Sequence, residues 1–434
     1  MKNHILFLPT RYFPSISGAE FYLQRMAEIL SKKYDYEVDV FTSNAIDFKA
    51  LRNPKGKTIN KKEKYHDMVN NLKINRFPVN YEVLKEDQQR KIKNIDAYKL
   101  LELSDDCLQE LIENGPYLPD LIEHASRSAN SDYKLIHATF FPYFNLVISL
   151  ILGKMLDIPV IVTPFFHFSN PRYLEPALIE VLTKFDLIIA CTSIEKRVIM
   201  NKTGISGEKI IVIPMGVDIE KFENAPGSGV KNYCFKENYF KKKEKKYKMV
   251  LYCGYKNYEK GALSVLKSIP LVLEKVKNVY FVFIGPTTMA YNREFSKVKK
   301  KDNVRIINLT PDNLTGYFDK KKIAAFKEAD LYLMPSRSDA FGIAFLEAWA
   351  AGKPVIGANI GATPHVINNN LDGFLVEFDN PKDISEKVVK LLKNKKLRRS
   401  FGAAGKEKVR IEHTWDLIAE RTHFVYQHLI NARD

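Results

Sequence analysis

The sequence predicts two doubly wound α/β domains, and three observations carry that expectation. At 434 residues the chain exceeds one small core and suits two domains of roughly 200 residues each. Hydrophobic residues make up 45% and aromatic residues 12%, as in a water-soluble globular protein. Short apolar runs alternate along the chain with longer stretches of helical period, which is typical of repeated strand–helix–strand units. We expect a first domain over 1–222, a Lys-rich linker over 223–248, a second domain over 249–413 and a final helix over 414–434.

The most informative stretch is 329–359. Its apolar run 331–334 is closed by Pro335 and reads as a buried parallel strand. After a polar turn, Gly342 lets the backbone bend into an Ala-rich helix over 343–351, which Gly352 ends. A second strand begins near Val355. Two acids therefore belong to one strand–helix–strand unit: Asp339 in the loop and Glu347 in the helix.

This geometry has a chemical consequence. Ligands of open parallel sheets bind beyond the carboxyl ends of the strands, where helix N-termini point. The amides of Phe341, Gly342, Ile343 and Ala344 would face such a ligand and favour an anion, typically phosphate. Asp339 beside them can accept from hydroxyls, and Glu347 can accept a pair of vicinal hydroxyls such as those of a ribose. The combination predicts a sugar nucleotide.

The chain begins with the same kind of unit. A strand over 5–8 leads through a loop containing Gly18 to an amphipathic helix, and a second strand follows over 37–42. The loop lacks the Gly-x-Gly-x-x-Gly fingerprint, which counts against a dinucleotide cofactor. Gly18 permits close approach of the backbone to a ligand, or it is only a turn residue.

Two more loops follow predicted strands. The strand over 158–164 ends at Phe165-Phe166-His167, which puts His167 at the carboxyl end of a strand, where it has either a functional or only a structural role. The strand over 247–253 leads into Gly254-Tyr255-Lys256-Asn257-Tyr258-Glu259-Lys260-Gly261.

Together these motifs resemble glycosyltransferase family four, whose members have the GT-B fold. The resemblance rests on the two acids eight positions apart, on the Phe341-Gly342 pair and on the Ala-x-Ala-x-Gly-x-Pro-Val-Ile sequence ending at Ile356. The segment 209–218, KIIVIPMGVD, is similar to the family's strand and turn at the end of the first domain. The resemblance covers nearly the whole chain and is strongest from Lys209 onward.

The resemblance implies two Rossmann-like domains facing a cleft, with the first domain binding the acceptor and the final helix crossing back to it. It implies catalytic roles for Asp339, Glu347 and His167. The implied donor-binding residues are Gly18, Lys256, Lys260, Phe341, Gly342, Ile343, Ala344 and Glu347. It further implies transfer with retention of configuration.

Several positions depart from the family pattern. Asp339 stands where the family has Glu, and Ser17 replaces the first Gly of the Gly-Gly-x-Glu loop. His365 occupies a usual Glu position. Tyr255 stands where the family has an Arg that neutralises the pyrophosphate, and a phenol cannot replace a bidentate guanidinium. Either Lys256 or Arg337 substitutes for it, or donor affinity is weak.

The net charge and the cysteine content limit which partners and cofactors the sequence predicts. The net charge is +16, concentrated in Lys-rich stretches such as 49–64 and 231–248. This charge indicates either that the protein is attracted to an anionic membrane face or that the lysines lie on solvated loops without a partner role. Stacking aromatics are not interleaved with these lysines, so we expect no nucleic-acid partner. The four cysteines are far apart, and no Asp-x-Asp motif marks a donor loop, so we expect neither a disulfide framework nor an essential metal or other cofactor.

No apolar run is long enough to span a bilayer, and the first residues do not resemble a signal peptide. We expect a cytoplasmic protein, and the positive charge leaves open a peripheral position at the inner membrane face. The predicted function is transfer of a sugar from a nucleotide sugar to a hydroxyl of a glycan, glycolipid or lipid-linked saccharide. Two alternatives remain open: a catalytically weak protein that binds sugar nucleotides or polysaccharides, and another GT-B enzyme such as a sugar-nucleotide epimerase or a phosphorylase.

Overall fold

The computed structural model describes residues 3–15, 17–61, 64–127, 132–223 and 233–432. The chain forms two compact units, each with its own sheet. Unit 1 runs to Pro214 and resumes at Trp415, and unit 2 is Met215–Thr414.

Unit 1 is built on an eight-stranded sheet with the order β3-β4-β2-β1-β5-β6-β7-β8. All its strand pairs are parallel except β3 with β4. The central strands are nearly continuous apolar runs because helices cover both faces of the sheet. The strands are β1 His4–Leu8, β2 Glu37–Ser43, β3 His66–Val69, β4 Leu72–Phe77, β5 Tyr133–Thr139, β6 Val160–Thr163, β7 Leu187–Ala190 and β8 Ile210–Val212.

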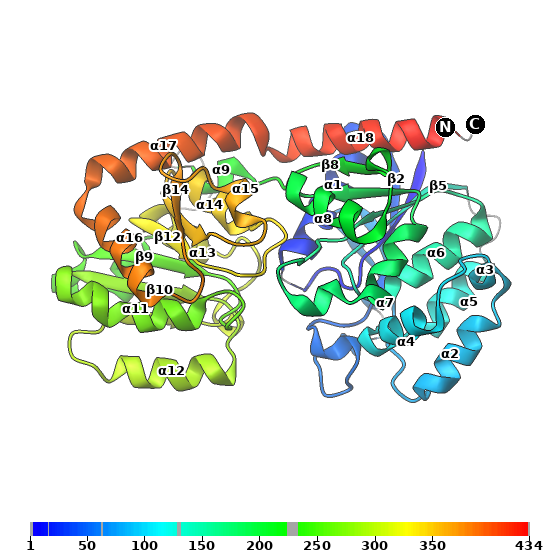
Figure 1. Ribbon diagram of the computed structural model, residues 1–434, viewed down its shortest axis with the longest axis horizontal. Coiled ribbons are helices and arrows are strands. Elements are labelled where there is room, and N and C mark those ends of the chain that lie inside the picture. Colours follow the sequence, from blue (N-terminus) through cyan, green and yellow to red (C-terminus); the bar gives the residue numbers. More distant parts are fainter. Residues whose placement is uncertain (1–2, 16, 62–63, 128–131, 224–232, 433–434) are drawn as a thin grey trace. The chain divides into compact units, whose positions relative to one another are not determined.

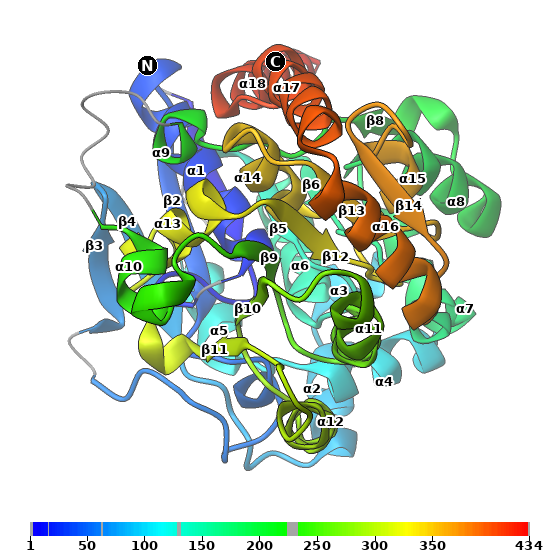
Figure 2. The same ribbon diagram turned by 90° about the vertical axis from the view of Figure 1, so that its left-hand side faces the viewer.

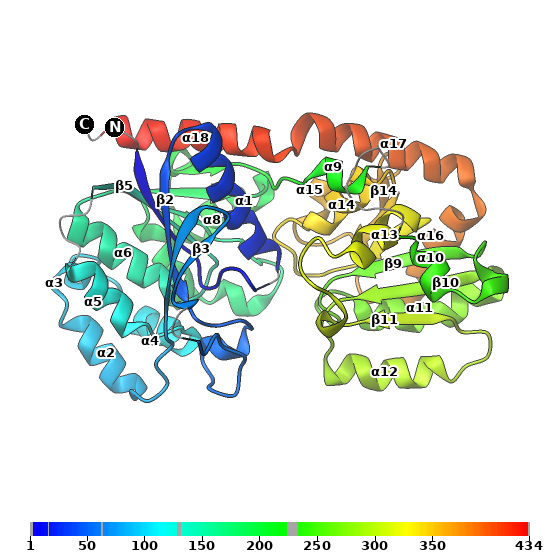
Figure 3. The same ribbon diagram turned by 180° about the vertical axis from the view of Figure 1, so that it is seen from behind.

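The last helix of the chain belongs to unit 1, where α18 packs on α1 (Figures 1 and 3). The prediction that the final helix returns to the first domain is therefore confirmed. Phe424 of this helix is 64% exposed and so does not belong to its buried face. The helices of unit 1 are α1 Gly18–Lys33, α2 Lys85–Lys93, α3 Asp96–Lys99, α4 Asp105–Asn114, α5 Pro119–Arg127, α6 Asn145–Leu156, α7 Pro176–Ile179, α8 Ser193–Thr203 and α18 Trp415–Asn431, with short 3₁₀ turns at Lys49–Leu51, Pro171–Leu174, Glu180–Lys184 and Gly207–Lys209.

Unit 2 has a six-stranded, wholly parallel sheet with the order β11-β10-β9-β12-β13-β14. The chain runs outward from β9 to β11 and then from β12 to β14 on the other side, so the strand order reverses between β9 and β12. Ligands of such sheets bind at this reversal, beyond the carboxyl ends of the strands. The strands are β9 Lys248–Cys253, β10 Val279–Ile284, β11 Ile306–Leu309, β12 Leu331–Met334, β13 Val355–Ala358 and β14 Gly373–Val376.

Helices pack around the unit 2 sheet, with α11 in contact with both α16 and α12 (Figure 2). On another part of the unit, α14 packs against α17 and α13. The helices of unit 2 are α9 Ile219–Phe222, α10 Phe235–Tyr239, α11 Ala262–Lys275, α12 Met289–Lys299, α13 Lys320–Glu328, α14 Ile343–Ala350, α15 Thr363–Val366, α16 Pro381–Lys393 and α17 Lys395–Glu412, with 3₁₀ turns at Lys242–Glu244 and Pro311–Asn313.

The expected linker over 223–248 differs from the structure. Compact packing divides the chain at Pro214, and the described part of the Lys-rich segment contains α10 and a 3₁₀ turn. Tertiary contacts order this segment although its sequence has no period: the carboxylate of Glu328 accepts from the amide of Lys236 at 2.9 Å, and Phe240 stacks on Tyr280 with ring centroids 3.8 Å apart. Residues 224–232 of the expected linker lie outside the described residues.

Candidate functional site

Two loops of unit 2 meet at the carboxyl edge of its sheet, where the strand order reverses. They are residues 254–261 after β9 and 335–342 after β12. Gly261 has φ +70°, and a Cβ there would lie 2.2 Å from the carbonyl oxygen of Pro335, so only glycine allows the loops to approach this closely. The backbone amide of Arg337 donates to the carbonyl of Glu259 at 2.8 Å, and their side chains form an ion pair.

Lys260 and Asp339 face each other across these two loops. The ammonium of Lys260 donates to the carbonyl of Ser338 at 2.6 Å and pairs with Oδ1 of Asp339. Their side chains are 20% and 12% exposed. The second oxygen of Asp339, Oδ2, is buried and accepts no hydrogen bond from the described residues. Since a buried carboxylate oxygen normally has a donor, this atom is an unused acceptor beside a cation.

The tip of α14 completes this group. Gly342 precedes the helix with φ +95°, and a Cβ there would lie 2.7 Å from the ring of Phe345. Phe341 is buried edge-on against His413, with ring centroids 5.5 Å apart, whereas Ala344 is partly exposed. The first amides of a helix have no partner within it, so this tip offers donors for an anion.

Glu347 lies in the second turn of α14 and is almost fully buried, at 2% exposure. Its Oε1 accepts from the ammonium of Lys322 on α13 at 2.7 Å. The Tyr317 hydroxyl also hydrogen bonds to this carboxylate, and the ring of Tyr317 lies 3.7 Å from the Lys322 nitrogen. The sequence interpretation missed Lys322. Its spacing was the available signal, because Lys322 precedes the buried Phe326 by four residues and so shares its helix face.

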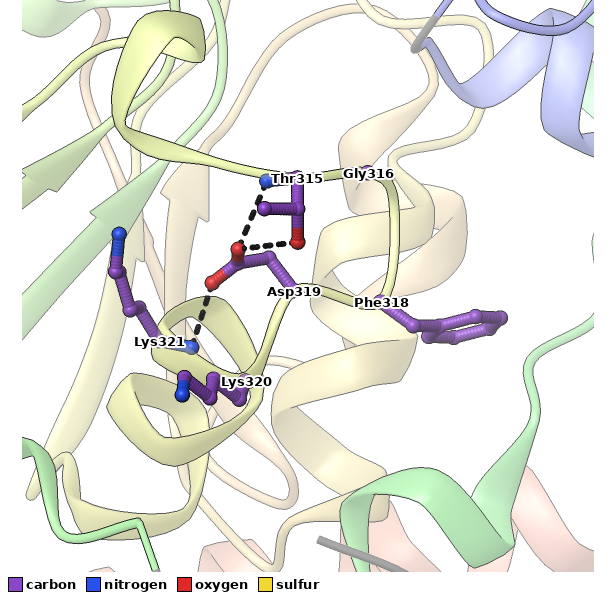
Figure 4. Close-up of a pocket in the computed structure, with 6 residues that line it drawn as sticks. All are labelled: Thr315, Gly316, Phe318, Asp319, Lys320 and Lys321. Carbon is purple, nitrogen blue, oxygen red and sulfur yellow. Dashed lines mark hydrogen bonds between the residues drawn. The ribbon is translucent and has the colours of Figure 1, made fainter.

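The helix that carries Lys322 has a well-defined start (Figure 4). Oδ1 of Asp319 accepts from the amide of Lys321 at 2.7 Å. Oδ2 accepts from the amide and the hydroxyl of Thr315 at 2.8 and 2.9 Å. Burial opposes the ionisation of Asp319, but these hydrogen bonds outweigh it and lower its pKa. Such capping fixes the direction of α13 and therefore the position of Lys322.

Lys256 does not join this group. Its side chain is fully buried, and its ammonium donates to Oδ1 of Asn308 at 2.6 Å and to the carbonyl of Leu309 at 2.8 Å. Burial lowers the pKa of Lys256 to about 7. In this structure the nitrogen of Lys256 points into the interior of unit 2 towards β11, away from the expected donor position, so its contact with the donor stays a prediction.

The other proposed substitute for the family's guanidinium is also engaged. Arg337 is paired with Glu259, and its guanidinium lies 5.7 Å from the ring centroid of Tyr258. Tyr255, at the family's Arg position, is 45% exposed. Among the three candidate donor-binding cations, Lys260 is therefore the one whose ammonium pairs with Asp339.

Gly18 and His167 belong to unit 1. Gly18 is the first residue of α1, and the neighbouring Glu20 is buried in an ion pair with Arg11 at 2.6 Å. His167 follows β6, is half-buried, and lies 5.3 Å from the ring of Tyr173. Both residues lie at the carboxyl edge of the unit 1 sheet. Gly18 lies where the loop after β1 enters α1, and His167 lies in the loop after β6.

The loop that carries His167 is anchored by the buried carboxylate of Glu195. Oε1 of Glu195 accepts from the amide of Phe166 at 2.8 Å, and Oε2 accepts from the amide of Cys191 at 2.6 Å. Burial raises the pKa of Glu195 to about 7, against the effect of these amides. This carboxyl group thus anchors the backbone next to His167.

No group of three or more His, Cys, Asp or Glu side chains in the described residues is arranged to hold a metal ion. In the same part of the chain, every helix is too short or too polar to cross a bilayer.

Comparison with known proteins places these features in a family. Residues 235–408 match the family model described as Glycosyl transferases group 1, and residues 107–221 match Glycosyltransferase Family 4. An uncharacterized glycosyltransferase of Methanocaldococcus jannaschii is 26% identical over 247 residues, which cover 56% of this chain and 66% of that protein. The phosphatidyl-myo-inositol mannosyltransferase of Mycobacterium leprae is 28% identical over 223 residues, 51% of this chain and 54% of that protein. These matches thus span between half and two thirds of the relatives' length.

The fold is shared along nearly the whole chain. The structure of Anabaena Alr3699/HepE in complex with UDP-glucose superposes with a TM-score of 0.69 at 15% identity and covers 98% of this chain and 100% of that one. The sucrose-phosphate synthase from Thermosynechococcus elongatus superposes with a TM-score of 0.66, also at 15% identity, and covers 100% of each chain. At such identity the likeness concerns the fold.

Proposed function

This chain belongs to glycosyltransferase family 4 of the GT-B fold, and on that premise we propose that it transfers a sugar from a nucleotide sugar to an acceptor hydroxyl with retention of configuration. The observation that carries the proposal is the juxtaposition of Lys260, Asp339 and the tip of α14 at the reversal point of the unit 2 sheet. A cation, helix amides and an unused carboxylate oxygen suit a diphosphate joined to a hydroxylated sugar.

Lys260 and the helix amides would bind the diphosphate. In the transfer, the bond between the anomeric carbon and the diphosphate oxygen breaks, and the acceptor's hydroxyl oxygen forms a bond to the same carbon. Negative charge develops on the departing nucleoside diphosphate, which takes up the proton that the acceptor hydroxyl loses. A fixed ammonium and the amides of Gly342, Ile343 and Ala344 stabilise that charge more in the transition state than in the ground state. Phe341 contributes by packing on His413 and so fixing the loop that precedes these amides.

Asp339 would read the donor sugar. Its Oδ1 is held by Lys260, and its buried Oδ2 has no donor among the described residues. A sugar hydroxyl that donates to Oδ2 would satisfy this atom and orient the sugar relative to the diphosphate. Glu347, deeper in α14, is proposed to accept the hydroxyls of the nucleotide's ribose.

Unit 1 would bind the acceptor. Gly18 permits close approach of the backbone to a ligand, and His167 can hydrogen bond to a hydroxyl from the loop that Glu195 anchors. The acceptor is proposed to be a glycan, glycolipid or lipid-linked saccharide. The positive net charge of +16 supports an acceptor at an anionic membrane surface.

The donor base is proposed from the structural neighbours. Anabaena Alr3699/HepE is seen with UDP, with UDP and glucose, and with UDP-glucose. We therefore take UDP-sugars as the first donors to test. We propose further that the transfer needs no essential metal, because Lys260 and the helix amides already supply positive charge where the diphosphate would lie.

A thermal-shift screen of UDP-, GDP- and ADP-sugars tests the donor. The true donor should raise the melting temperature in a concentration-dependent way, since binding to the folded state stabilises it. The same donor should release free sugar slowly in the absence of an acceptor. Glu347→Ala should abolish both the shift and the release, and a variant that retains them would overturn the assigned site.

The engaged Arg337 and the exposed Tyr255 favour a second candidate, a sugar-nucleotide-binding protein with little activity. Such a protein would show the thermal shift and no sugar release with any of these donors.

A further inference from the structure

Lys322 and Glu347 form a buried ion pair that the function outlined above does not yet use. Their side chains are 9% and 2% exposed, and the ammonium lies 2.7 Å from Oε1. Helix α13 ends just before β12 and α14 begins after it, so the pair is carried by the helices that flank one strand of the reversal point. Each residue comes from a helix, and α13 and α14 pack against each other.

We infer that Lys322 is a positioning residue for Glu347: it holds the carboxylate so that the remaining lone pairs accept the vicinal hydroxyls of the donor's ribose. This inference rests on the proposed function, because it takes Glu347 as the ribose-binding acid. Lys322 itself does not touch the nucleotide in this arrangement.

The hydrogen-bond capacity of the carboxylate supports this role. An ionised carboxylate has about four acceptor sites. Lys322 uses one on Oε1, and the Tyr317 hydroxyl donates to the same group. The remaining acceptor sites suit a pair of hydroxyl groups. The hydrogen bond from Tyr317 shows that this carboxylate already accepts from one hydroxyl.

Lys322 is itself held in place. Its nitrogen lies 3.7 Å from the centroid of the Tyr317 ring and 5.9 Å from that of Phe326. Aromatic faces attract a cation at these distances, most strongly where water is excluded. The ammonium is thus confined between the two rings and the carboxylate, so it constrains the orientation of Glu347.

A contribution to stability does not by itself explain why a buried ion pair occurs here. Replacing a buried ion pair by apolar residues of similar size is often neutral or stabilising, because desolvation of the charges offsets their attraction. Along the rest of α14, Phe345, Leu346 and Trp349 are fully buried apolar side chains. A charge pair at this place is explained by a ligand that needs the carboxylate.

Paired ribose and 2′-deoxyribose nucleotides test the inference. The probe is whichever of UDP, GDP and ADP binds wild type most tightly, compared by isothermal titration with its 2′-deoxy form. If Glu347 accepts the 2′-hydroxyl, wild type should prefer the ribose form by about 10-fold or more, as expected for a hydrogen bond to a charged group. Glu347→Gln and Lys322→Met should each reduce the preference to about 3-fold or less, and Lys322→Arg should retain most of it.

Lys320→Met, at an exposed lysine on the same helix, is the matched control and should keep the wild-type preference. A purely structural role of Lys322 would lower the affinities for both nucleotide forms alike. The inference is overturned if Lys322→Met keeps the preference while Glu347→Gln loses it. If wild type shows no preference, or Glu347→Gln keeps it, the ribose role of Glu347 in the proposed function is what fails.

Lys322→Met leaves a buried carboxylate without its cation and can prevent folding. The double variant Lys322→Met/Glu347→Gln carries no unpaired charge and keeps the inference testable. It should bind both nucleotide forms as Glu347→Gln does, since Lys322 acts through Glu347. A further loss of affinity for the ribose form alone would mean that Lys322 contacts the ligand, which would contradict the assigned role.

Discussion

Arg337 and Glu259 join the two loops of the candidate donor site through a bidentate ion pair. Nε of Arg337 lies 3.0 Å from Oε2, and Nη2 lies 2.5 Å from Oε1. The hydrogen bonds of Arg337 to Glu259 raise the pKa of the arginine. The pair keeps the loop after β9 beside the loop after β12, and so keeps Lys260 beside Asp339.

Arg337→Met should weaken binding of the nucleoside diphosphate by loosening this alignment. Because the pair is about 27–30% exposed, we expect a loss of no more than about 1 kcal/mol, or roughly fivefold in affinity. Isothermal titration measures it. The exchanged pair Glu259→Arg/Arg337→Glu should recover part of the affinity. A larger loss in Arg337→Met that the exchange does not recover would indicate that Arg337 contacts the nucleotide itself.

Lys260 and Lys256, four residues apart, should behave in opposite ways. Lys260→Met removes the cation proposed for the diphosphate and should lower nucleotide affinity by about tenfold or more, with a small effect on stability. Lys256→Met leaves the buried oxygens of Asn308 and Leu309 without a donor, so it should lower the melting temperature and leave affinity within about twofold.

Titration and thermal melts of both lysine variants check this pair of outcomes. If Lys256→Met lost affinity as Lys260→Met does, a rearrangement of the loop on binding would have to bring Lys256 to the nucleotide, which contradicts the present placement.

His137 should make the stability of unit 1 depend on pH. It is fully buried, with Nδ1 2.5 Å from the Tyr426 hydroxyl and Nε2 2.8 Å from the Thr163 hydroxyl, and burial lowers its pKa to about 3. Because the folded pKa lies below the ordinary value of 6.5, the stabilisation is complete above pH 6.5 and is lost as the pH falls from 6.5 towards 3.

Denaturant unfolding of wild type and of His137→Gln between pH 4 and pH 8 measures this effect. The difference in unfolding free energy between the two proteins should shrink as the pH falls below 6.5. His428→Gln, at an exposed histidine of α18, should show no such dependence. A constant difference for His137→Gln would mean that the imidazole titrates alike in the folded and unfolded chain.

The strands, loops and helices around the candidate site were determined by the sequence alone, because the signals there are local. Apolar runs and caps mark the element ends: Thr192 caps α8 by accepting from the amide of Glu195, and Gly342 precedes α14 at a positive φ, as its position predicts. The meeting of Lys260 with Asp339 was also predictable, since loops after parallel strands gather at one edge of the sheet.

Only the tertiary structure decided which charges are available at that edge. From the sequence, Lys260 matches the family's Lys, and Lys256 and Arg337 are both candidates to replace the missing Arg. The fold buries Lys256, pairs Arg337 with Glu259 and brings Lys260 to Asp339. It also supplies Lys322 to Glu347 from another helix. Motifs specify which residues lie at a loop or helix tip, whereas the direction and pairing of a charged side chain depend on contacts with residues distant in sequence.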